Sequence, residues 1–312
     1  MFNNVTKKQK KILDVAVKKQ EPNQNEIEQN KAFLCKQLVL VTLPHSDPGD
    51  VEGWARKNGN VTLQITPGVD VNPNTQEIRK IGLPYGTLPR LLMCWLTTEA
   101  IRTKSKRIEL GGNLSEFMKK LGLTSSGGSK GDITRLRNQM ERLFRSHISF
   151  RVDASKDNDS RERWLNMQIA ASGDVWWENL DSNSGKWKSW VELEEKFYES
   201  ICAAPVPLDM EILKAIKHSP LLLDLYKWAT WRSYTTIQSG KNQFIPWHEL
   251  EKQFGSNYKD QKHFREKVRK AWTELKLVYT GLDADIVEGG ITFFPTTKTS
   301  VKIKKKTLAP QA

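Results

Sequence analysis

The sequence has few of the features that mark disulfide-bonded, metal-binding or membrane proteins. Its 312 residues include three cysteines, Cys35, Cys94 and Cys202, which are far apart and show no metal-binding spacing. Such cysteines are typical of ordinary buried thiols in a reducing compartment. No run of about 18 apolar residues is present, and the N-terminus lacks the apolar core of a signal peptide. We therefore expect a cytoplasmic protein with no membrane partner.

The short motifs of common enzyme classes are also missing. The five histidines never form an HxH pair, and no HExxH, CxxC or GxSxG motif occurs. The segment 127–130, GGSK, lacks the spacing of a nucleotide-binding P-loop. Asp and Glu show no two-metal spacing, although carboxylates can converge in space. These absences predict a protein that is not an enzyme, with no catalytic residues, no metal site and no cofactor.

Positive charge, in contrast, is abundant and clustered. The chain has 49 Lys and Arg against 36 Asp and Glu, a net charge of +13. Residues 101–146 carry a net charge of +7 and residues 259–312 a net charge of +6, so the rest is near neutral. An excess of this size indicates an acidic partner, either nucleic acid or an anionic membrane surface. Its clustering favours two separate binding surfaces.

The first basic region contains a strongly amphipathic segment at 131–147. Asp132 is the predicted N-cap, and apolar residues recur at helical spacing: Ile133, Leu136, Met140, Leu143 and Phe144. The opposite side carries Arg135, Asn138, Arg142 and Arg145. Arginine suits phosphate and guanine, and asparagine suits adenine, so this side is typical of a DNA recognition helix. A solvated charged helix is the alternative interpretation.

The surrounding pattern predicts the element order of a winged helix, a helix-turn-helix variant. We expect a helix at 88–103, a strand at 107–110, a helix at 113–121 and the helix at 131–147. Two strand-like runs, 147–154 and 163–171, follow as a hairpin whose tip would be the wing. Trp176, Trp177, Trp187 and Trp190 come next, and packing is the favoured role for them over base stacking.

A second unit repeats this order. Short helix 207–218 precedes a helix that starts at Ser219 and Pro220 and runs to about 233. A strand at 244–246, a helix at 247–254 and a basic helix at 259–275 follow. The basic helix presents Lys262, Arg265, Arg269 and Lys270. A strand pair, 277–283 and 290–295, flanks the loop 284–289. We interpret this as an internal repeat of architecture.

The predicted fold class is therefore α+β, with two winged-helix domains in tandem, at 83–200 and 201–297. Residues 1–30 are expected to be a loosely ordered, solubilising segment, with a possible helix at 8–19 whose apolar side carries Ile12, Leu13, Ala16 and Val17. Residues 31–82 have an uncertain fold, with strands at 37–43 and 60–66 separated by a loop. Residues 298–312, which include KIKKK at 302–306, form a basic tail.

Two blocks of the chain resemble the plasmid-encoded RepA replication initiators. The first is LPYGTLPRLLMCWLTTEAIRTKSKRIELGGNLSEFMKKLGLTSSGGSKGDITRLRNQMERLF at 83–144, and the second is FYESICAAPVPLDMEILKAIKHSPLLLDLYKWATWR at 197–232. With the region between and after them, the resemblance spans about 80–295. It implies a protein that binds repeated double-stranded sequences (iterons) at a plasmid origin, helps to open the duplex and recruits host replication proteins such as an initiator and a helicase. It also implies dimers that repress the protein's own gene.

Two alternatives stay open. One is a sequence-specific transcription repressor with no replication role, and the other is an initiator enzyme that nicks DNA.

Overall fold

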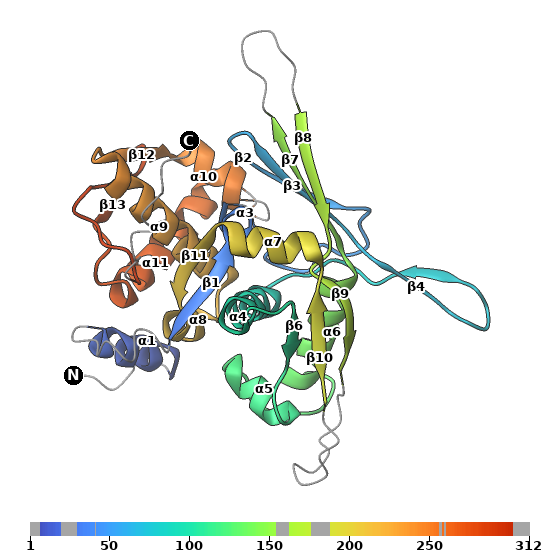
Figure 1. Ribbon diagram of the computed structural model, residues 1–312. Coiled ribbons are helices and arrows are strands. Elements are labelled where there is room, and N and C mark those ends of the chain that lie inside the picture. Colours follow the sequence, from blue (N-terminus) through green and yellow to red (C-terminus); the bar gives the residue numbers. More distant parts are fainter. Residues whose placement is uncertain are drawn as a thin grey trace, which may run out of the picture.

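The structure is a computed structural model that describes residues 7–19, 30–40, 42–153, 162–175, 188–255, 258 and 260–301. It is a mixed α+β fold (Figure 1). The helices are α1 (Lys7–Lys18), α3 (Lys36–Leu40), α4 (Leu88–Thr103), α5 (Leu114–Lys120), α6 (Asp132–Arg145), α7 (Glu195–Ala203), α8 (Met210–Ile216), α9 (Pro220–Ser239), α10 (Trp247–Phe254) and α11 (Gln261–Val278). None of them, within the described ranges, combines the length and apolar character needed to cross a bilayer.

The strands form several small antiparallel sheets. They are β1 (Lys31–Cys35), β2 (Trp54–Asn58), β3 (Val61–Thr66), β4 (Val69–Val71), β5 (Ile78–Lys80), β6 (Arg107–Glu109), β7 (His147–Asp153), β8 (Glu162–Met167), β9 (Ala170–Asp174), β10 (Trp190–Leu193), β11 (Pro205–Asp209), β12 (Gln243–Pro246), β13 (Ala284–Val287) and β14 (Gly290–Phe293). The sheet orders are β1-β11, β2-β3-β7-β8, β4-β5, β6-β10-β9 and β12-β14-β13. The β4–β5 hairpin projects from the body (Figure 1).

One arrangement of elements occurs twice. The first unit runs α4, β6, α5, α6, β9 and β10, and the second runs α9, β12, α10, α11, β13 and β14. In both, the strand between the first two helices pairs with the last strand, which also pairs with the strand before it. The predicted order of helix, short strand, helix and basic helix is therefore present in both units. In the first unit, however, β7 and β8 are inserted between α6 and β9, so the predicted hairpin does not complete that unit.

The first unit differs from the prediction in which strands join its short strand. Strands β7 and β8 do form an antiparallel hairpin, but β7 also pairs with β3 in a separate four-stranded sheet. The partner of β6 is β10, from the tryptophan-rich region, with Val191 opposite Ile108. The reason is burial, because both side chains are almost fully enclosed in the core. The hairpin tip, 154–161, and the residues Trp176, Trp177 and Trp187 lie outside the described residues.

Many predicted boundaries of the two units are close to those observed, and several need correction. The N-cap of α6 is Gly131, because Asp132 is already helical and its carboxylate accepts hydrogen bonds from the backbone N and the Oγ1 of Thr124 at 3.1 and 2.9 Å. Helix α9 starts at Pro220, with the Ser219 hydroxyl capping Leu222 N as predicted, but it continues to Ser239. The strand predicted at 277–283 is wrong, because α11 continues to Val278 and β13 lies in the segment 284–289 that was predicted as a loop. The chain turns at 288–289 before β14. The helix predicted at 207–218 begins only at Met210, because 205–209 is strand β11.

Residues 31–82, whose fold was uncertain from the sequence, begin with strand β1, which links this region to the rest of the protein. The predicted strand at 37–43 is wrong, since Lys36–Leu40 is helix α3, and the predicted loop contains β2. The strand β3 is confirmed. Strand β1 pairs with β11 on one edge, and its other edge meets α4, where Phe33 N donates to Thr98 Oγ1 at 2.9 Å and Thr97 Oγ1 donates to Phe33 O. A buried strand needs such partners on both edges.

The N-terminal helix α1 packs against the second unit, so the expectation of a loosely ordered segment is wrong for 7–18. Ile12 and Val15 are buried, and α1 contacts α8 and α11. Leu13 and Val17, predicted on the same apolar side, are exposed. The Lys19 ammonium anchors the end of the helix 2.5 Å from the Asp209 carboxylate.

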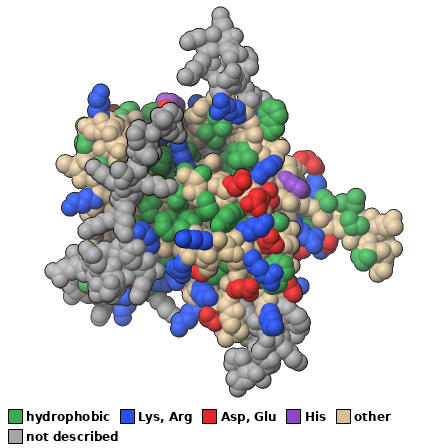
Figure 2. Space-filling model, viewed as in Figure 1, with side chains coloured by type: hydrophobic (Ala, Val, Ile, Leu, Met, Phe, Trp, Pro, Cys, Tyr) green, Lys and Arg blue, Asp and Glu red, His purple; other side chains and the backbone are tan. Residues whose placement is uncertain are grey.

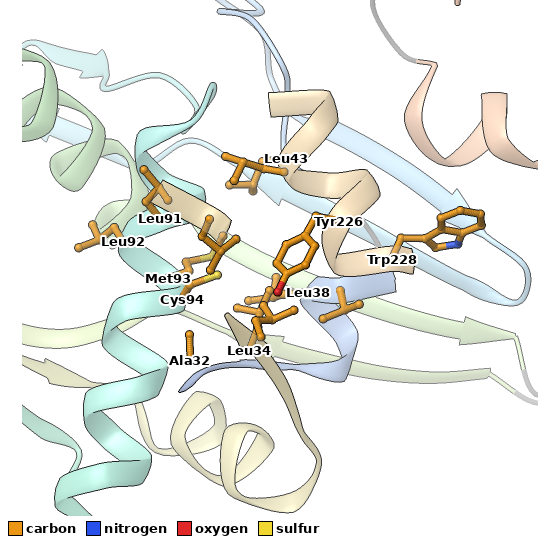
Figure 3. Packing of buried hydrophobic residues seen from close by; sticks show 14 of the residues in the cluster. Ala32, Leu34, Leu38, Leu43, Leu91, Leu92, Met93, Cys94, Tyr226 and Trp228 are labelled. Atoms are coloured by element: carbon orange, nitrogen blue, oxygen red, sulfur yellow. The ribbon is translucent and has the colours of Figure 1, made fainter. Parts of the chain in front are cut away.

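A single apolar core runs through both units (Figure 3). It includes side chains of β1 and α3, such as Leu34 and Leu38, side chains of α4, such as Leu92 and Cys94, and side chains of α9, such as Trp228. Of the predicted buried thiols, Cys35 and Cys94 are enclosed, and burial raises the pKa of Cys94 to about 12. Cys202 is exposed, so that part of the prediction is wrong.

A buried ion pair joins the first helices of the two units. Arg90 on α4 donates from Nε and Nη2 to the two carboxylate oxygens of Asp224 on α9, at 2.9 and 2.7 Å. Its other donors reach the carbonyl oxygens of Leu43, Pro44 and Gly86, so all five guanidinium N–H groups have acceptors. Arg90 and Asp224 are each 1% exposed.

Two further groups face the Asp224 carboxylate. Lys227 Nζ lies 2.6 Å from Oδ1, and His45 Nε2 lies 3.0 Å from Oδ2. Burial alone would raise the pKa of the carboxyl, but Arg90 and Lys227 outweigh it and hold that pKa well below its usual range. Burial lowers the pKa of His45, and the charges of Arg90 and Lys227 lower it further against the opposing effect of Asp224. His45 is therefore held neutral in the folded protein.

Replacing Arg90 by methionine should lower the free energy of unfolding by about 3–5 kcal/mol, because it leaves Asp224 buried with weaker compensation. Urea denaturation followed by circular dichroism measures the change. The control is Glu52→Gln, which removes the exposed contact between Glu52 and Lys80 and should leave stability unchanged. An Arg90→Met variant as stable as the wild type would show that this ion pair is not needed.

Stability should fall as pH drops below 6.5, the ordinary histidine value, because the unfolded state then binds a proton that folded His45 excludes. The full contribution is present above that pH, and the loss is at most about 1.4 kcal/mol per pH unit. His45→Asn should flatten this part of the stability–pH curve, whereas His248→Asn, at an exposed histidine, should not. Identical curves for both variants would contradict the assignment.

Candidate nucleic-acid interface

The exposed side of α6 carries three of the four predicted residues. Arg135, Asn138 and Arg145 are exposed, while Leu136, Met140 and Leu143 are buried on the opposite side. Arg135 reaches back to the Asp132 carboxylate at 3.1 Å, and Arg145 lies 3.5 Å from the Asp70 carboxylate of β4. These pairs are solvated, and pairs of this kind contribute little, so the guanidiniums can exchange them for phosphates.

Arg142 is held by the protein itself, with a side chain that is 16% exposed. Its Nη1 donates to Leu83 O at 3.2 Å and lies 3.3 Å from the Asp47 carboxylate, and its guanidinium lies over the Tyr85 ring. These contacts fix the 83–85 segment, just ahead of α4, against α6. A role of Arg142 in reading DNA stays a prediction.

Sequence reasoning missed Arg137, which is exposed on α6 and has no ion pair among the described residues. It lies one position before Asn138. It was not predicted because it falls outside the i, i+3, i+7 spacing that Arg135, Asn138 and Arg142 share. It lines a cavity of about 440 Å³ formed with Met140, Glu141 and strand β9.

The second basic helix, α11, presents its cations more openly. Lys262, Arg269 and Lys270 are exposed, and Arg265 is half-buried. The guanidiniums of Arg265 and Arg269 lie 5.8 and 5.4 Å from the ring of Trp247. Stacking of this kind holds an arginine in place and leaves its N–H groups available. The predicted start of the helix at Lys259 lies outside the described residues, and Asp260 caps α11 by accepting from His263 N at 2.7 Å.

The predicted residues thus lie on two helices of separate units and do not form one cluster. Helix α6 packs on α4 and β9, and α11 packs on α9, α10 and α1. Each is the third helix of its unit and exposes a side with guanidinium or ammonium groups. Such groups bind phosphate and the edges of bases, so the arrangement suits a nucleic acid contacted at two places.

In the described ranges, no three His, Cys, Asp or Glu side chains lie close enough together to hold a metal ion.

Replacing Arg142 by alanine should lower the free energy of unfolding by about 1–3 kcal/mol, because it removes charge-assisted hydrogen bonds. Arg135→Ala, at an exposed position of the same helix, should leave stability unchanged within about 0.5 kcal/mol. Thermal denaturation separates the two. If Arg142→Ala kept full stability and weakened binding to one DNA sequence only, Arg142 would be a base-reading residue.

The chain was compared with solved structures and with curated proteins. It is similar to a structure of RctB domains 2–3, with a TM-score of 0.48 and 12% identity over 82% of this chain and 93% of that one. The selenomethionine derivative of domains 2 and 3 of RctB gives a TM-score of 0.48 and 11% identity over 80% of this chain and 93% of that one. No curated protein matches the chain.

One protein family matches a large part of the chain. The family described as plasmid encoded RepA protein matches residues 83–249, which is more than half of the chain. The matched region contains the whole first unit together with α9, β12 and the start of α10. It also contains both blocks on which the resemblance was noted. The chain therefore belongs to the plasmid-encoded RepA family of replication initiators.

Proposed function

We propose that this protein is a plasmid replication initiator that binds repeated double-stranded sequences at the plasmid origin through α6 and α11. The observation that carries the proposal is the repeated architecture, which exposes a basic third helix in each of two units within a RepA family chain. The helices supply base contacts, and the remaining cations supply contacts to phosphate.

The finer fold assignment belongs to the same proposal. We infer that both units are winged helices, and the support is that the short strand pairs with the last strand of the unit in each. In the first unit, the β7–β8 hairpin would be an addition to the fold. In the second unit, the wing would be the turn between β13 and β14.

A duplex contacted by both units would show a bipartite site. Each recognition helix occupies one major groove, so we expect protection over about two turns of duplex. On α6, Arg135 and Asn138 are the exposed candidates for guanine and adenine edges, and on α11 they are Lys262 and Arg269. Opening of the duplex, recruitment of host replication proteins and repression of the protein's own gene as a dimer complete the proposal. These three functions are proposed from membership of the family alone.

Direct binding experiments test the proposal. The wild-type protein should bind a duplex with the origin repeat more tightly than a scrambled duplex in fluorescence anisotropy. The variants Lys262→Ala with Arg269→Ala, and Arg135→Ala with Asn138→Ala, should each lose about 1–3 kcal/mol per base contact on the repeat and much less on the scrambled duplex. A control variant, Lys57→Ala, replaces an exposed lysine on β2 and should bind as the wild type does. Equal binding of the two duplexes by the wild type would contradict sequence-specific initiation.

Two assays separate the alternatives. A plasmid that carries only this gene and its origin should replicate, and failure with intact DNA binding would favour a repressor without a replication role. Supercoiled origin DNA should stay closed when it is mixed with the protein and Mg²⁺, because we propose no enzymatic activity. A nicked product would favour the enzyme.

A further inference from the structure

Four cations from three elements gather where the two units meet. They are Lys11 on α1, Arg135 on α6, Lys214 on α8 and Lys217 just after α8, and we call them the cationic seam. Lys217 Nζ donates to the carbonyl oxygen of Gly122, in the turn between α5 and α6. The Lys214 stem lies so close to Gly122 that a Cβ there would stand 3.1 Å from Lys214 Cγ. The first unit therefore rests directly on the lysines of α8.

The members of the seam affect one another electrostatically. Burial lowers the pKa of both Lys214 and Lys217, and the positive charge of Lys11 lowers each of them further. Asp132 raises the pKa of Lys217 and Glu211 raises that of Lys214, while Arg135 lowers the pKa of Lys217, so the carboxylates oppose only part of the effect. Like charges that are half-buried beside one another are unfavourable unless an opposite charge joins them.

The acidic groups nearby are already engaged. Asp132 accepts from Thr124 and pairs with Arg135 at 3.1 Å. Glu211 lies 3.4 Å from Lys19 Nζ. Asp14 stands three residues after Lys11 on α1. Within the described part of the chain, the four cations of the seam therefore have three nearby carboxylates, one of which is shared with Lys19, and a polyanion would supply the remaining counter-charge.

The position of the seam indicates which polyanion fits. It lies between α6 of the first unit and α8, which directly precedes the second unit, and α1 contacts both α8 and α11. Figure 2 shows several Lys and Arg side chains low on this face, with Asp and Glu side chains among them. A duplex that contacts α6 and α11 together would pass this region with its phosphate backbone.

We propose that the cationic seam binds the phosphate backbone of duplex DNA between the two recognition helices, and that α1 is part of the DNA interface. This inference rests on the proposed function and adds a third contact to it. Phosphate contacts carry no sequence information, so the seam raises affinity and fixes how the two units lie on the duplex. It also gives the N-terminal helix, which lies outside the matched region, a role beyond solubility.

The salt dependence of binding tests the inference with the full chain. Each lost phosphate contact lowers the slope of log affinity against log salt concentration by about 0.9. The variant Lys11→Gln with Lys214→Gln should therefore reduce the slope by about 2, with equal loss of affinity for origin and random duplex. Glutamine keeps part of the Lys214 stem, and Lys217 is left in place because it bonds to Gly122.

Matched variants make each outcome informative. Lys57→Gln with Lys196→Gln removes two exposed lysines on β2 and α7 and should leave the slope unchanged. Lys11→Gln alone, at an exposed position, should reduce the slope by about 1 without affecting folding. An unchanged slope in the folded seam variants, as judged by thermal denaturation, would overturn the inference while the proposed function stands. A wild-type chain that binds no duplex at all would overturn both.

Discussion

The buried ion pair between Arg90 and Asp224 is the contact on which the arrangement of the two units depends. Burying two charges is costly, and the geometry compensates for it with a bidentate pair, three backbone acceptors and two further groups on the carboxylate. Such a network is satisfied in one arrangement only, because a small shift would leave a charge unpaired. It therefore sets how the first helix of one unit lies against the first helix of the other.

Other features of the fold reinforce this junction. Strand β1 lies between α4 and β11, so a segment from the N-terminal region links the two units through hydrogen bonds on both of its edges. The apolar core is continuous across them. Because α6 and α11 are the third helices of units joined in this way, the distance between their exposed faces is fixed by the body of the protein. If both helices bind DNA as proposed, we expect a bipartite site with constant spacing.

Local patterns in the sequence were sufficient to predict most of the helices of the two units. The apolar spacing of α6 and the Ser219 and Pro220 signal of α9 depend on residues close together in the chain, so they could be read directly. The errors have long-range causes. Strand β10 was missed as the partner of β6 because strand pairing joins residues about 80 positions apart. Helix α3 was predicted as a strand because the short run KQLVL is apolar and β-branched only in part, and its context decides its state.

The candidate site also has features that the sequence predicts and features that depend on long-range contacts. The exposure of Arg135, Asn138, Lys262 and Arg269 follows from helical periodicity and needed only the sequence. The partial burial of Arg142 depends on Asp47, which is 95 residues away, and could not be inferred from spacing. The seam likewise depends on how α1 and α8 meet the first unit. Its lysines are far apart in the sequence and follow no shared periodicity. Only the three-dimensional structure shows that they lie near one another.

We propose that both units bind one DNA duplex while they are held in a fixed arrangement. Hydroxyl-radical footprinting of the full chain on its plasmid origin tests it most directly. If both units bind the duplex together, every repeat should show two protected patches, at constant spacing over about two turns of duplex, with backbone protection between them. A single patch per repeat, or two patches whose spacing varies from repeat to repeat, would contradict it.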